Sequence, residues 1–243
     1  MKFAIISDIH SNLEALEAVL SRIRNVDKII CLGDIVGYGP NPNECIDLIR
    51  NQENLVCIAG NHDKAAVGIM DMTNFNRNAK DAMLWTKITL TDENKEYLKA
   101  LPLTLDIPEF QIVHGSLVNP LEEYITNLAE ASPTLQKMEK PILFVGHSHA
   151  PLYIGQKEDG MIEGKKLKDK DSVDTKLFKK IIINVGSIGQ PRDGDPNASY
   201  VFYNHADKIA HLNRVHYNIK QVQEKMTEAE LPDALINRLT NGL

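Results

Sequence analysis

The sequence has few cysteines, few aromatic residues and no excess of positive charge, and each shortage argues against a class of protein. Its three cysteines (Cys31, Cys45 and Cys57) contain no C-x-x-C pair, which disfavours disulfide scaffolds and thiolate zinc sites. Lys and Arg number 27 against 33 Asp and Glu, a formal net charge of −6, so no dedicated nucleic-acid binding is expected. Aromatic residues make up 6% of the chain, which gives no sign of a base-stacking platform.

Long hydrophobic runs are also missing. No stretch approaches the 18 apolar residues that a membrane helix needs. The apolar run at residues 3–6 ends at Ser7 and Asp8, and it is too short for the core of a secretion signal. We therefore expect a cytoplasmic protein that does not bind membranes.

Short apolar runs rich in β-branched residues recur along the 243 residues, and each ends abruptly at Gly or at a polar residue. Their continuous apolar character predicts strands buried on both faces. Helices are predicted between the early runs: Ser11-x-x-Glu14 resembles a capping box, and Pro42 suits a first helical position. The order strand–helix–strand indicates an α/β protein. The predicted buried strands are 3–6, 28–32, 55–59, 110–113, 142–145 and 180–185.

The rest of the chain is consistent with one domain over residues 1–243. Residues 64–101 break the strand–helix rhythm and predict a helical insertion, either a lid beside a site or a packed helical pair. Short strands are expected after Ala150, and helices near 218–226 and 232–241. The charged stretch 157–179 is expected to be an exposed hairpin or a mobile loop.

Polar side chains follow all six predicted buried strands, and five of the eight histidines are among them. Ligands of open α/β sheets bind at the carboxyl ends of the strands, so we expect these side chains to meet at one edge. A single His after a strand is commonly a turn residue, but five such positions together point to a shared site. These histidines are His10, His62, His114, His147 and His149.

Asp, Asn and His, without Cys, are donors that suit Mn, Fe, Zn, Ni or Mg. The set is too large for one tetrahedral ion and fits two six-coordinate ions. An Asp at the end of the second strand would be central enough to bridge them. Two such ions, about 3.5–4 Å apart, would hold a bridging hydroxide and neutralise a phosphoryl transition state.

Five motifs in this order resemble those of the calcineurin-like metallophosphoesterases, over residues 3 to about 191. The closing segment, 184–192, is similar to that of small bacterial members of the family. The resemblance implies a four-layer αββα sandwich of two mixed β-sheets. The motifs are Asp8-x-His10, Gly33-Asp34-x-x-Gly37, Gly60-Asn61-His62-Asp63, His114-Gly115 and Gly146-His147-x-His149.

The resemblance also implies two transition-metal ions, each Mn, Fe, Zn or Ni. Asp34 would bridge them. The ligands of the first ion would be Asp8, His10, Asp34 and His149, and those of the second Asp34, Asn61, His114 and His147.

By the same resemblance, His62 would be the general acid that protonates the leaving group, oriented by Asp63. The alternative is that His62 only forms a hydrogen bond next to the metal ligands. Arg192 could bind a second phosphate, or it could pair with Asp193 and Asp195.

Arg77 and Lys80, in the helical insertion, could add an anion contact. The alternative, which we favour, is an exposed helix face.

We expect a dinuclear phosphoester hydrolase. Protein phosphatases of the family are generally longer, so the short insertion favours a small phosphate ester or nucleotide such as diadenosine tetraphosphate. Phosphodiester and phosphomonoester hydrolysis are alternatives. A non-catalytic metal-binding scaffold is a further alternative, but such relatives tend to lose ligands, and all positions are filled here.

Overall fold

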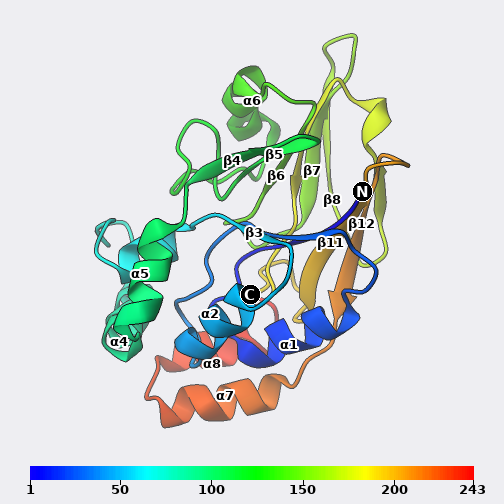
Figure 1. Ribbon diagram of the computed structural model, residues 1–243. Helices are drawn as coiled ribbons and strands as arrows, with labels where there is room; N and C mark the ends of the chain where they lie inside the picture. The colour runs from blue at the N-terminus through cyan, green and yellow to red at the C-terminus, as the bar shows by residue number, and fades with distance from the viewer.

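The computed structural model of the protein describes residues 1–243 and contains two mixed six-stranded sheets (Figure 1). The first sheet has the strand order β3-β2-β1-β11-β12-β9, and β1, β2 and β3 run parallel in it. Its strands are β1 (Lys2–Ile6), β2 (Lys28–Cys31), β3 (Leu55–Cys57), β9 (Ser172–Asp174), β11 (Ala198–Asn204) and β12 (Ile209–Val215).

The second sheet has the order β4-β5-β6-β10-β7-β8, and β5, β6 and β10 run parallel in it. Five of the six predicted buried strands start and end within one residue of an observed strand, and the observed strand at 55–59 ends two residues earlier than predicted. The strands of this sheet are β4 (Thr104–Ile107), β5 (Phe110–Val113), β6 (Ile142–Val145), β7 (Leu152–Gln156), β8 (Ile162–Lys166) and β10 (Lys180–Asn184).

Three hydrophobic clusters divide the molecule into four layers. The middle cluster lies between the sheets and joins Phe3 and Tyr203 of the first sheet to Phe110 and Phe144 of the second. A second cluster packs most of the helices onto the outer face of the first sheet, and a third packs α6 onto the outer face of the second sheet (Figure 1). This arrangement confirms the predicted αββα sandwich.

The helices cover the two outer faces unequally, because α6 alone packs on the second sheet. No helix of the structure is long and apolar enough to cross a membrane. The helices are α1 (Leu13–Arg22), α2 (Pro42–Arg50), α3 (Asn61–Ala66), α4 (Arg77–Thr89), α5 (Asp92–Ala100), α6 (Leu128–Lys137), α7 (Ile219–Glu228) and α8 (Asp233–Arg238).

The predicted helical insertion contains α4 and α5, which pack into the helix-side cluster through Met83 and Leu98. The ammonium group of Lys64, in α3, donates hydrogen bonds to the carbonyl oxygens of Leu98, Lys99 and Leu101 at the end of α5. These bonds satisfy carbonyls that a helix end leaves without partners. The two helices therefore pack against α2 and α3.

The charged stretch 157–179 is only partly an exposed hairpin. Its first part forms the β7–β8 hairpin within the second sheet. Its later part crosses to the first sheet, where β9 pairs with β12. The expectation of a hairpin or loop was wrong for residues 172–174, whose short strand contains one buried residue, Val173.

Candidate metal centre

The predicted site residues follow β1, β2 and β3 of the first sheet and β5 and β6 of the second. Contacts between the two sheets bring these strand ends together. The backbone N–H of His147, after β6, donates to the carboxylate of Asp8, after β1, at 3.0 Å. The ring of His114, after β5, contacts the carbonyl oxygen of Leu32, after β2, at 2.9 Å. The shared edge therefore belongs to two packed sheets, as the resemblance implied, whereas the strand pattern alone suggested a single sheet.

One group of possible metal ligands consists of Asp8, His10 and His149, all buried. The Nε2 atom of His149 lies 3.1 Å from Oδ1 of Asp8 and 3.0 Å from Nε2 of His10. The Nε2 atom of His10 lies 3.7 Å from the same Asp8 oxygen. Three donor atoms from two loops, the one after β1 and the one after β6, thus converge on one point.

A second group consists of Asp34, His114 and His147, also buried. The Nε2 atom of His114 lies 3.4 Å from Oδ2 of Asp34 and 3.1 Å from Nδ1 of His147. The amide oxygen of Asn61 lies 3.2 Å from the same His114 nitrogen. The structure therefore brings Asn61 to this group, as the resemblance implied.

Asp34 connects the two groups. Its Oδ2 atom lies 3.4 Å from Nε2 of His114 and 3.6 Å from Nε2 of His10. A third possible ligand group, His10, Asp34 and His62, overlaps both of the others. One carboxylate at the centre of two donor sets is the arrangement that a bridging ligand requires.

Backbone carbonyls hold three of the imidazoles. The Nδ1 atoms of His10, His114 and His149 lie 3.1, 2.9 and 2.6 Å from the carbonyl oxygens of Val36, Leu32 and Gln190. A carbonyl oxygen only accepts, so each Nδ1 carries a hydrogen, and Nε2 is the atom that presents a lone pair to the centre whenever the ring is neutral.

The positions of these lone pairs indicate whether the residues can bind metal ions. The Nε2 atoms of His10 and His149 face each other at 3.0 Å, a repulsive contact unless a cation or proton lies between them. Two buried carboxylate oxygens, Oδ1 of Asp8 and Oδ2 of Asp34, have no hydrogen-bond partner, and neither has Nε2 of His147. Buried polar atoms normally have partners, so the donor set fits bound cations.

The backbone at the site is strained in a way that supports the same interpretation. Several of its residues have the left-handed φ values that non-glycine residues rarely adopt. Such strain costs about 1–3 kcal/mol per residue and is concentrated at functional sites. The residues are Asp8 (φ 54°), His10 (φ 49°), Asp34 (φ 52°), His147 (φ 65°) and His149 (φ 58°).

The protonation states also suit metal binding. Burial opposes the ionisation of Asp8 and Asp34, but the neighbouring imidazoles of His149 and His114 hold both carboxyl pKa values below their usual range. Burial and the neighbouring His114 lower the pKa of His147 to about 3. The pKa of His114 is raised to about 10, because the carboxylate of Asp34 outweighs the effect of burial. Ionised carboxylates and neutral imidazoles are the forms that bind metals, so Asp8, Asp34 and His147 are ready to bind. His114, in contrast, has to release a proton when a cation binds.

Two glycines allow the loops to approach the carboxylates closely. A Cβ atom on Gly60 would lie 2.0 Å from Oδ1 of Asp34, and one on Gly146 would lie 2.6 Å from Oδ2 of Asp8. Side chains at these positions would displace the carboxylates. The glycines in the sequence motifs therefore leave room for the acidic groups.

His62 lies at the start of α3, with its backbone N–H donating to Oδ1 of Asp34 at 2.8 Å. Burial lowers the pKa of its ring to about 4. The ring packs against Tyr38 and Phe75, with centroid distances of 4.5 and 4.7 Å. Its Nδ1 atom has no hydrogen-bond partner and faces Gly37, where a Cβ would lie 2.4 Å away.

Asp63 does not orient the His62 ring, and that expectation was wrong. Its Oδ1 atom accepts the N–H groups of Ile35 and Val36 at 2.9 and 3.2 Å, and Oδ2 accepts that of Gly60 at 3.0 Å. The carboxylate thus fixes the loop that carries Asp34 to the start of α3. Backbone N–H groups that would otherwise be buried without partners compete for this side chain.

The two predicted anion-binding arginines differ in their surroundings. Arg192 makes no ion pair, because Asp193 and Asp195 both pair with Arg214 instead. The guanidinium of Arg192 lies 5.7 Å from the centre of the Tyr38 ring. The alternative that Arg192 pairs with Asp193 and Asp195 is therefore excluded.

Arg77 lies on an exposed helix face, the alternative that we favoured for this residue. Its side chain is 94% exposed, and its one ion pair is with Asp81, on the same helix, at 3.8 Å.

Three residues near the centre had no role in the sequence interpretation. The Tyr38 ring lies 4.7 Å from that of His10, and Tyr124 stacks on His147 with a centroid distance of 4.0 Å. Gln190 holds His149 through its carbonyl oxygen. Tyr38 and Gln190 are near or within the motifs, but their side chains are not metal donors. Tyr124 lies in a loop without any pattern.

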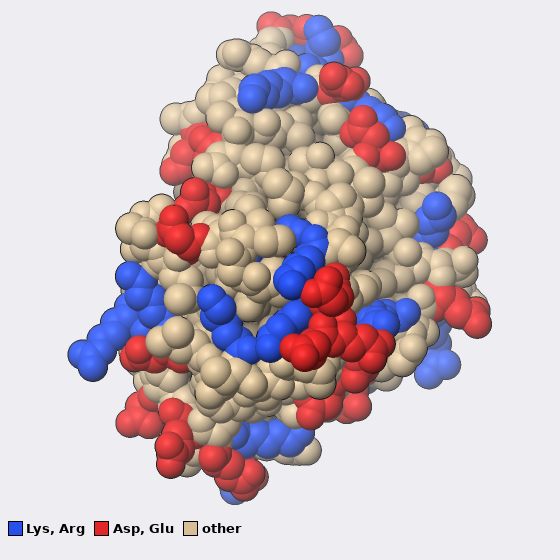
Figure 2. Space-filling model, turned by 60° about the vertical axis from the view of Figure 1, so that its left-hand side comes forward, with Lys and Arg blue, Asp and Glu red and all other residues tan.

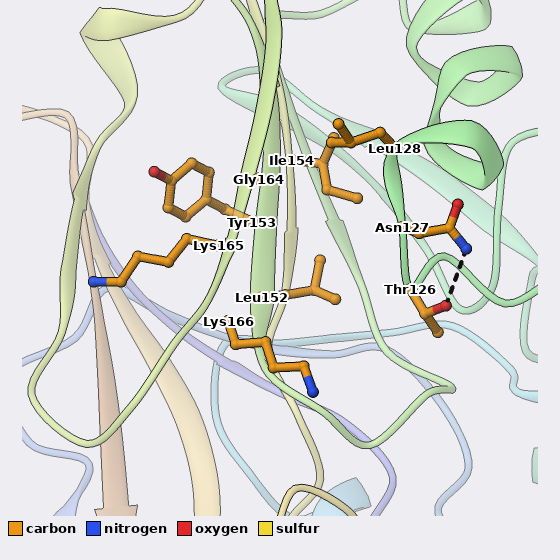
Figure 3. A pocket seen from close by; sticks show the side chains of 9 residues that line it. All are labelled: Thr126, Asn127, Leu128, Leu152, Tyr153, Ile154, Gly164, Lys165 and Lys166. Carbon is orange, nitrogen blue, oxygen red and sulfur yellow. Dashed lines mark hydrogen bonds between the residues drawn. The ribbon is translucent and has the colours of Figure 1, made fainter.

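A separate pocket of about 210 Å³ lies between the start of α6 and the β7–β8 hairpin (Figure 3). Leu128, Leu152 and Ile154 line it together with Lys165 and Lys166. It contains no carboxylate or imidazole and none of the predicted site residues. The chemistry of the molecule is therefore concentrated at the Asp34 centre and not in this pocket.

Comparisons with known proteins agree with this geometry. A model of the calcineurin-like phosphoesterase superfamily domain matches residues 1–208. A protein of Methanocaldococcus jannaschii, described as uncharacterized, is 40% identical over 253 aligned residues, which cover 98% of this chain and 97% of the relative.

Solved structures are also similar. The crystal structure of a metallophosphoesterase from Sphaerobacter thermophilus is 41% identical, with a TM-score of 0.90 and full coverage of both chains. A protein from Pyrococcus horikoshii is 23% identical, covers 100% of this chain and 98% of its own, and has a TM-score of 0.83, a likeness in fold alone.

Proposed function

The chain belongs to the calcineurin-like phosphoesterase superfamily and is a phosphoester hydrolase, and we propose that it uses two metal ions that share Asp34. The observation that carries this proposal is the position of one buried carboxylate oxygen within 3.6 Å of donor nitrogens from both ligand groups. Asp8, His10 and His149 would hold one ion with Asp34. Asn61, His114 and His147 would hold the other.

When bound, the two ions would lower the pKa of water and neutralise charge on the phosphoryl group. The oxygen and nitrogen donors suit Mn, Fe, Zn or Ni. The residues of the chain hold the ligand side chains in position. Carbonyl contacts to Nδ1 fix the direction of three imidazoles, and Asp63 fixes the loop that carries Asp34. Because these groups are oriented before the substrate binds, little reorganisation is needed during the reaction.

His62 is the group we assign to the leaving oxygen. Its Nδ1 atom packs against Gly37, which leaves Nε2 as the atom that faces the leaving oxygen. Burial lowers the pKa of the ring to about 4, so the ring would take up its proton as the anionic substrate binds. Its backbone bond to Asp34 keeps the ring beside the proposed bridging carboxylate. A positioned acid of this kind contributes about 10²–10⁴-fold to the rate.

We further propose a small nucleotide substrate, with diadenosine tetraphosphate as the specific candidate, and a cytoplasmic location. The insertion is short, and α4 and α5 pack against α2 and α3, whereas a protein substrate would need an extended groove. Arg192 lies close to the centre and has no acidic partner. A substrate with more than one phosphate would need such a cation to bind the additional phosphate. Phosphodiesters and phosphomonoesters are the alternatives.

The test is to measure bound metal and activity together. We expect two transition-metal ions per chain by mass spectrometry of the metal-loaded protein. We also expect kcat/KM to be higher for diadenosine tetraphosphate than for bis-p-nitrophenyl phosphate or p-nitrophenyl phosphate. One ion per chain at full activity would contradict the two-metal proposal. Higher kcat/KM for either of the other esters would contradict the proposed substrate.

A further inference from the structure

A second arginine, Arg238, lies beside Arg192, and it comes from the C-terminal helix α8. Arg238 is the last residue of α8, outside the residues 1–208 that match the superfamily. The C-terminal segment reaches the centre directly. Met226 and Leu239 line a small cavity together with His10, Tyr38 and Gln190. The backbone N–H of Gly194 also bonds to the carbonyl oxygen of Gly242 at 2.9 Å.

Gln190 joins both arginines to the proposed metal ligands. Its side-chain oxygen accepts hydrogen bonds from Nη2 of Arg192 at 2.8 Å and from Nη1 of Arg238 at 3.1 Å. Its backbone oxygen holds Nδ1 of His149 at 2.6 Å. Both guanidiniums therefore bind the same atom of Gln190, and Gln190 in turn contacts His149, one of the proposed metal ligands.

No acidic side chain forms an ion pair with Arg192 or Arg238. The polar contacts that orient Arg238 are the Gln190 side-chain oxygen and the main-chain oxygen of Leu243, the last residue of the sequence. The nearby acids Asp193 and Asp195 are occupied by Arg214. Burial and the charge of Arg192 lower the pKa of Arg238, which reflects the cost of holding two cations together.

Two adjacent guanidiniums without an acidic side chain as partner form a typical site for an oxyanion such as phosphate. Figure 2 shows Lys and Arg side chains around a hollow on one face of the molecule, with Asp and Glu grouped beside it. That face is mixed in sign, so the charge there favours a small anion over an extended polyanion.

We propose that Arg192 and Arg238 bind a second phosphoryl group of the substrate, next to the one that reacts at the metal centre. This inference rests on the proposed function and narrows it to phosphoric anhydrides such as nucleoside polyphosphates. Water adds its oxygen to the reacting phosphorus, and the bond from that phosphorus to the bridging oxygen breaks. The bridging oxygen leaves with the second phosphoryl group. The two protons of the water end on the product phosphates or in solvent, and the arginines stabilise the charge that the leaving group gains.

The test compares a ligand with two phosphoryl groups with a ligand that has one. Methylenediphosphonate and methylphosphonate are suitable, because neither can be hydrolysed at a bridging oxygen. Calorimetry with the metal-loaded protein gives the Kd of each. Arg238→Gln is expected to raise the Kd of methylenediphosphonate about tenfold or more, the effect of losing one charge-assisted contact, and to raise that of methylphosphonate by less. Arg24→Gln, at an exposed position, is the matched control and is expected to change neither.

Arg238→Lys keeps the charge but loses the forked geometry, so its Kd for methylenediphosphonate should lie between those of the wild type and Arg238→Gln. Unchanged circular dichroism and thermal melting would show that both variants fold. Equal changes for the two ligands, or no change for either, would overturn the inference and leave the proposed hydrolase standing. Binding of methylenediphosphonate that depends on Arg238, in a protein that hydrolyses no phosphate compound, would uphold the anion site and overturn the proposed function.

Discussion

Replacing Asp34 by Asn tests whether this carboxylate is present for metal binding or for stability. In the wild type, Oδ1 accepts the His62 N–H at 2.8 Å, and Oδ2 is buried without a partner. Asparagine keeps the first contact. Its amide group can donate to Nε2 of His114 or His10, which lie 3.4 and 3.6 Å from the present Oδ2. The change thus removes a buried negative charge and removes no hydrogen bond.

The magnitude follows from linkage between metal binding and folding. An ion at 100 times its Kd stabilises the folded protein by about 2.7 kcal/mol per site. For a chain of this size each kcal/mol raises Tm by about 2–4 °C. We expect Mn²⁺ to raise the Tm of the wild type by about 5–11 °C for each site filled. Asp34→Asn should lose most of this rise, because both sites share the carboxylate.

Without metal, the variant should be less stable than the wild type, because it loses the attraction between the Asp34 carboxylate and the ring of His114, whose pKa that carboxylate raises to about 10. Thermal melting with and without EDTA gives all four values, and Asp47→Asn, at an exposed position, is the control. The reasoning is refuted if the variant still gains the full Tm rise with Mn²⁺.

Two further substitutions test His62 as the proton donor and the close approach of Gly60 to Asp34. His62→Ala should keep both metals and lose about 10²–10⁴-fold in kcat on esters with poor leaving groups, with a smaller loss on p-nitrophenyl phosphate. Mass spectrometry and kinetics on the same sample decide this, and loss of metal together with activity would show that His62 is a ligand, as its place beside His10 and Asp34 allows. Gly60→Ala places a Cβ 2.0 Å from Oδ1 of Asp34, so bound metal should fall and stability should drop by about 1–3 kcal/mol. Gly160→Ala meets open space and is the control for metal content, and full metal binding by Gly60→Ala would contradict the packing argument.

The buried strands and the polar residues after them were predictable because both signals are local. Continuous apolar runs such as 110–113 and 142–145 match the observed strands without change. A polar residue directly after such a run has to lie at a strand end. The convergence of Asp8, Asp34 and His114 then follows from the topology.

Features that depend on the three-dimensional arrangement were not predictable. The division of the strand ends between two sheets came from the family resemblance alone, and the pairing of β10 with β6 in the second sheet leaves no mark in either run. β4 and α6 were not expected, and α6 contains Pro133, which removes a helical hydrogen bond and weakens the pattern.

Side-chain partners were the least predictable part of the site. Asp63 follows His62 in the sequence, which suggested that it orients the ring, but three backbone N–H groups bind its carboxylate. Arg238 is far from every motif, and only the packing of α8 brings it to Gln190. Such contacts are set by tertiary structure, for which the local sequence has no signal.

The most direct measurement is chromatography of the products formed from diadenosine tetraphosphate by the Mn²⁺-loaded protein, with Asp34→Asn as the control. The account predicts either ATP with AMP or two molecules of ADP from the wild type, and little product from Asp34→Asn. If the wild type releases no nucleotide while it hydrolyses simple esters, the proposed substrate is contradicted. If Asp34→Asn keeps the activity of the wild type, the shared-carboxylate mechanism is contradicted.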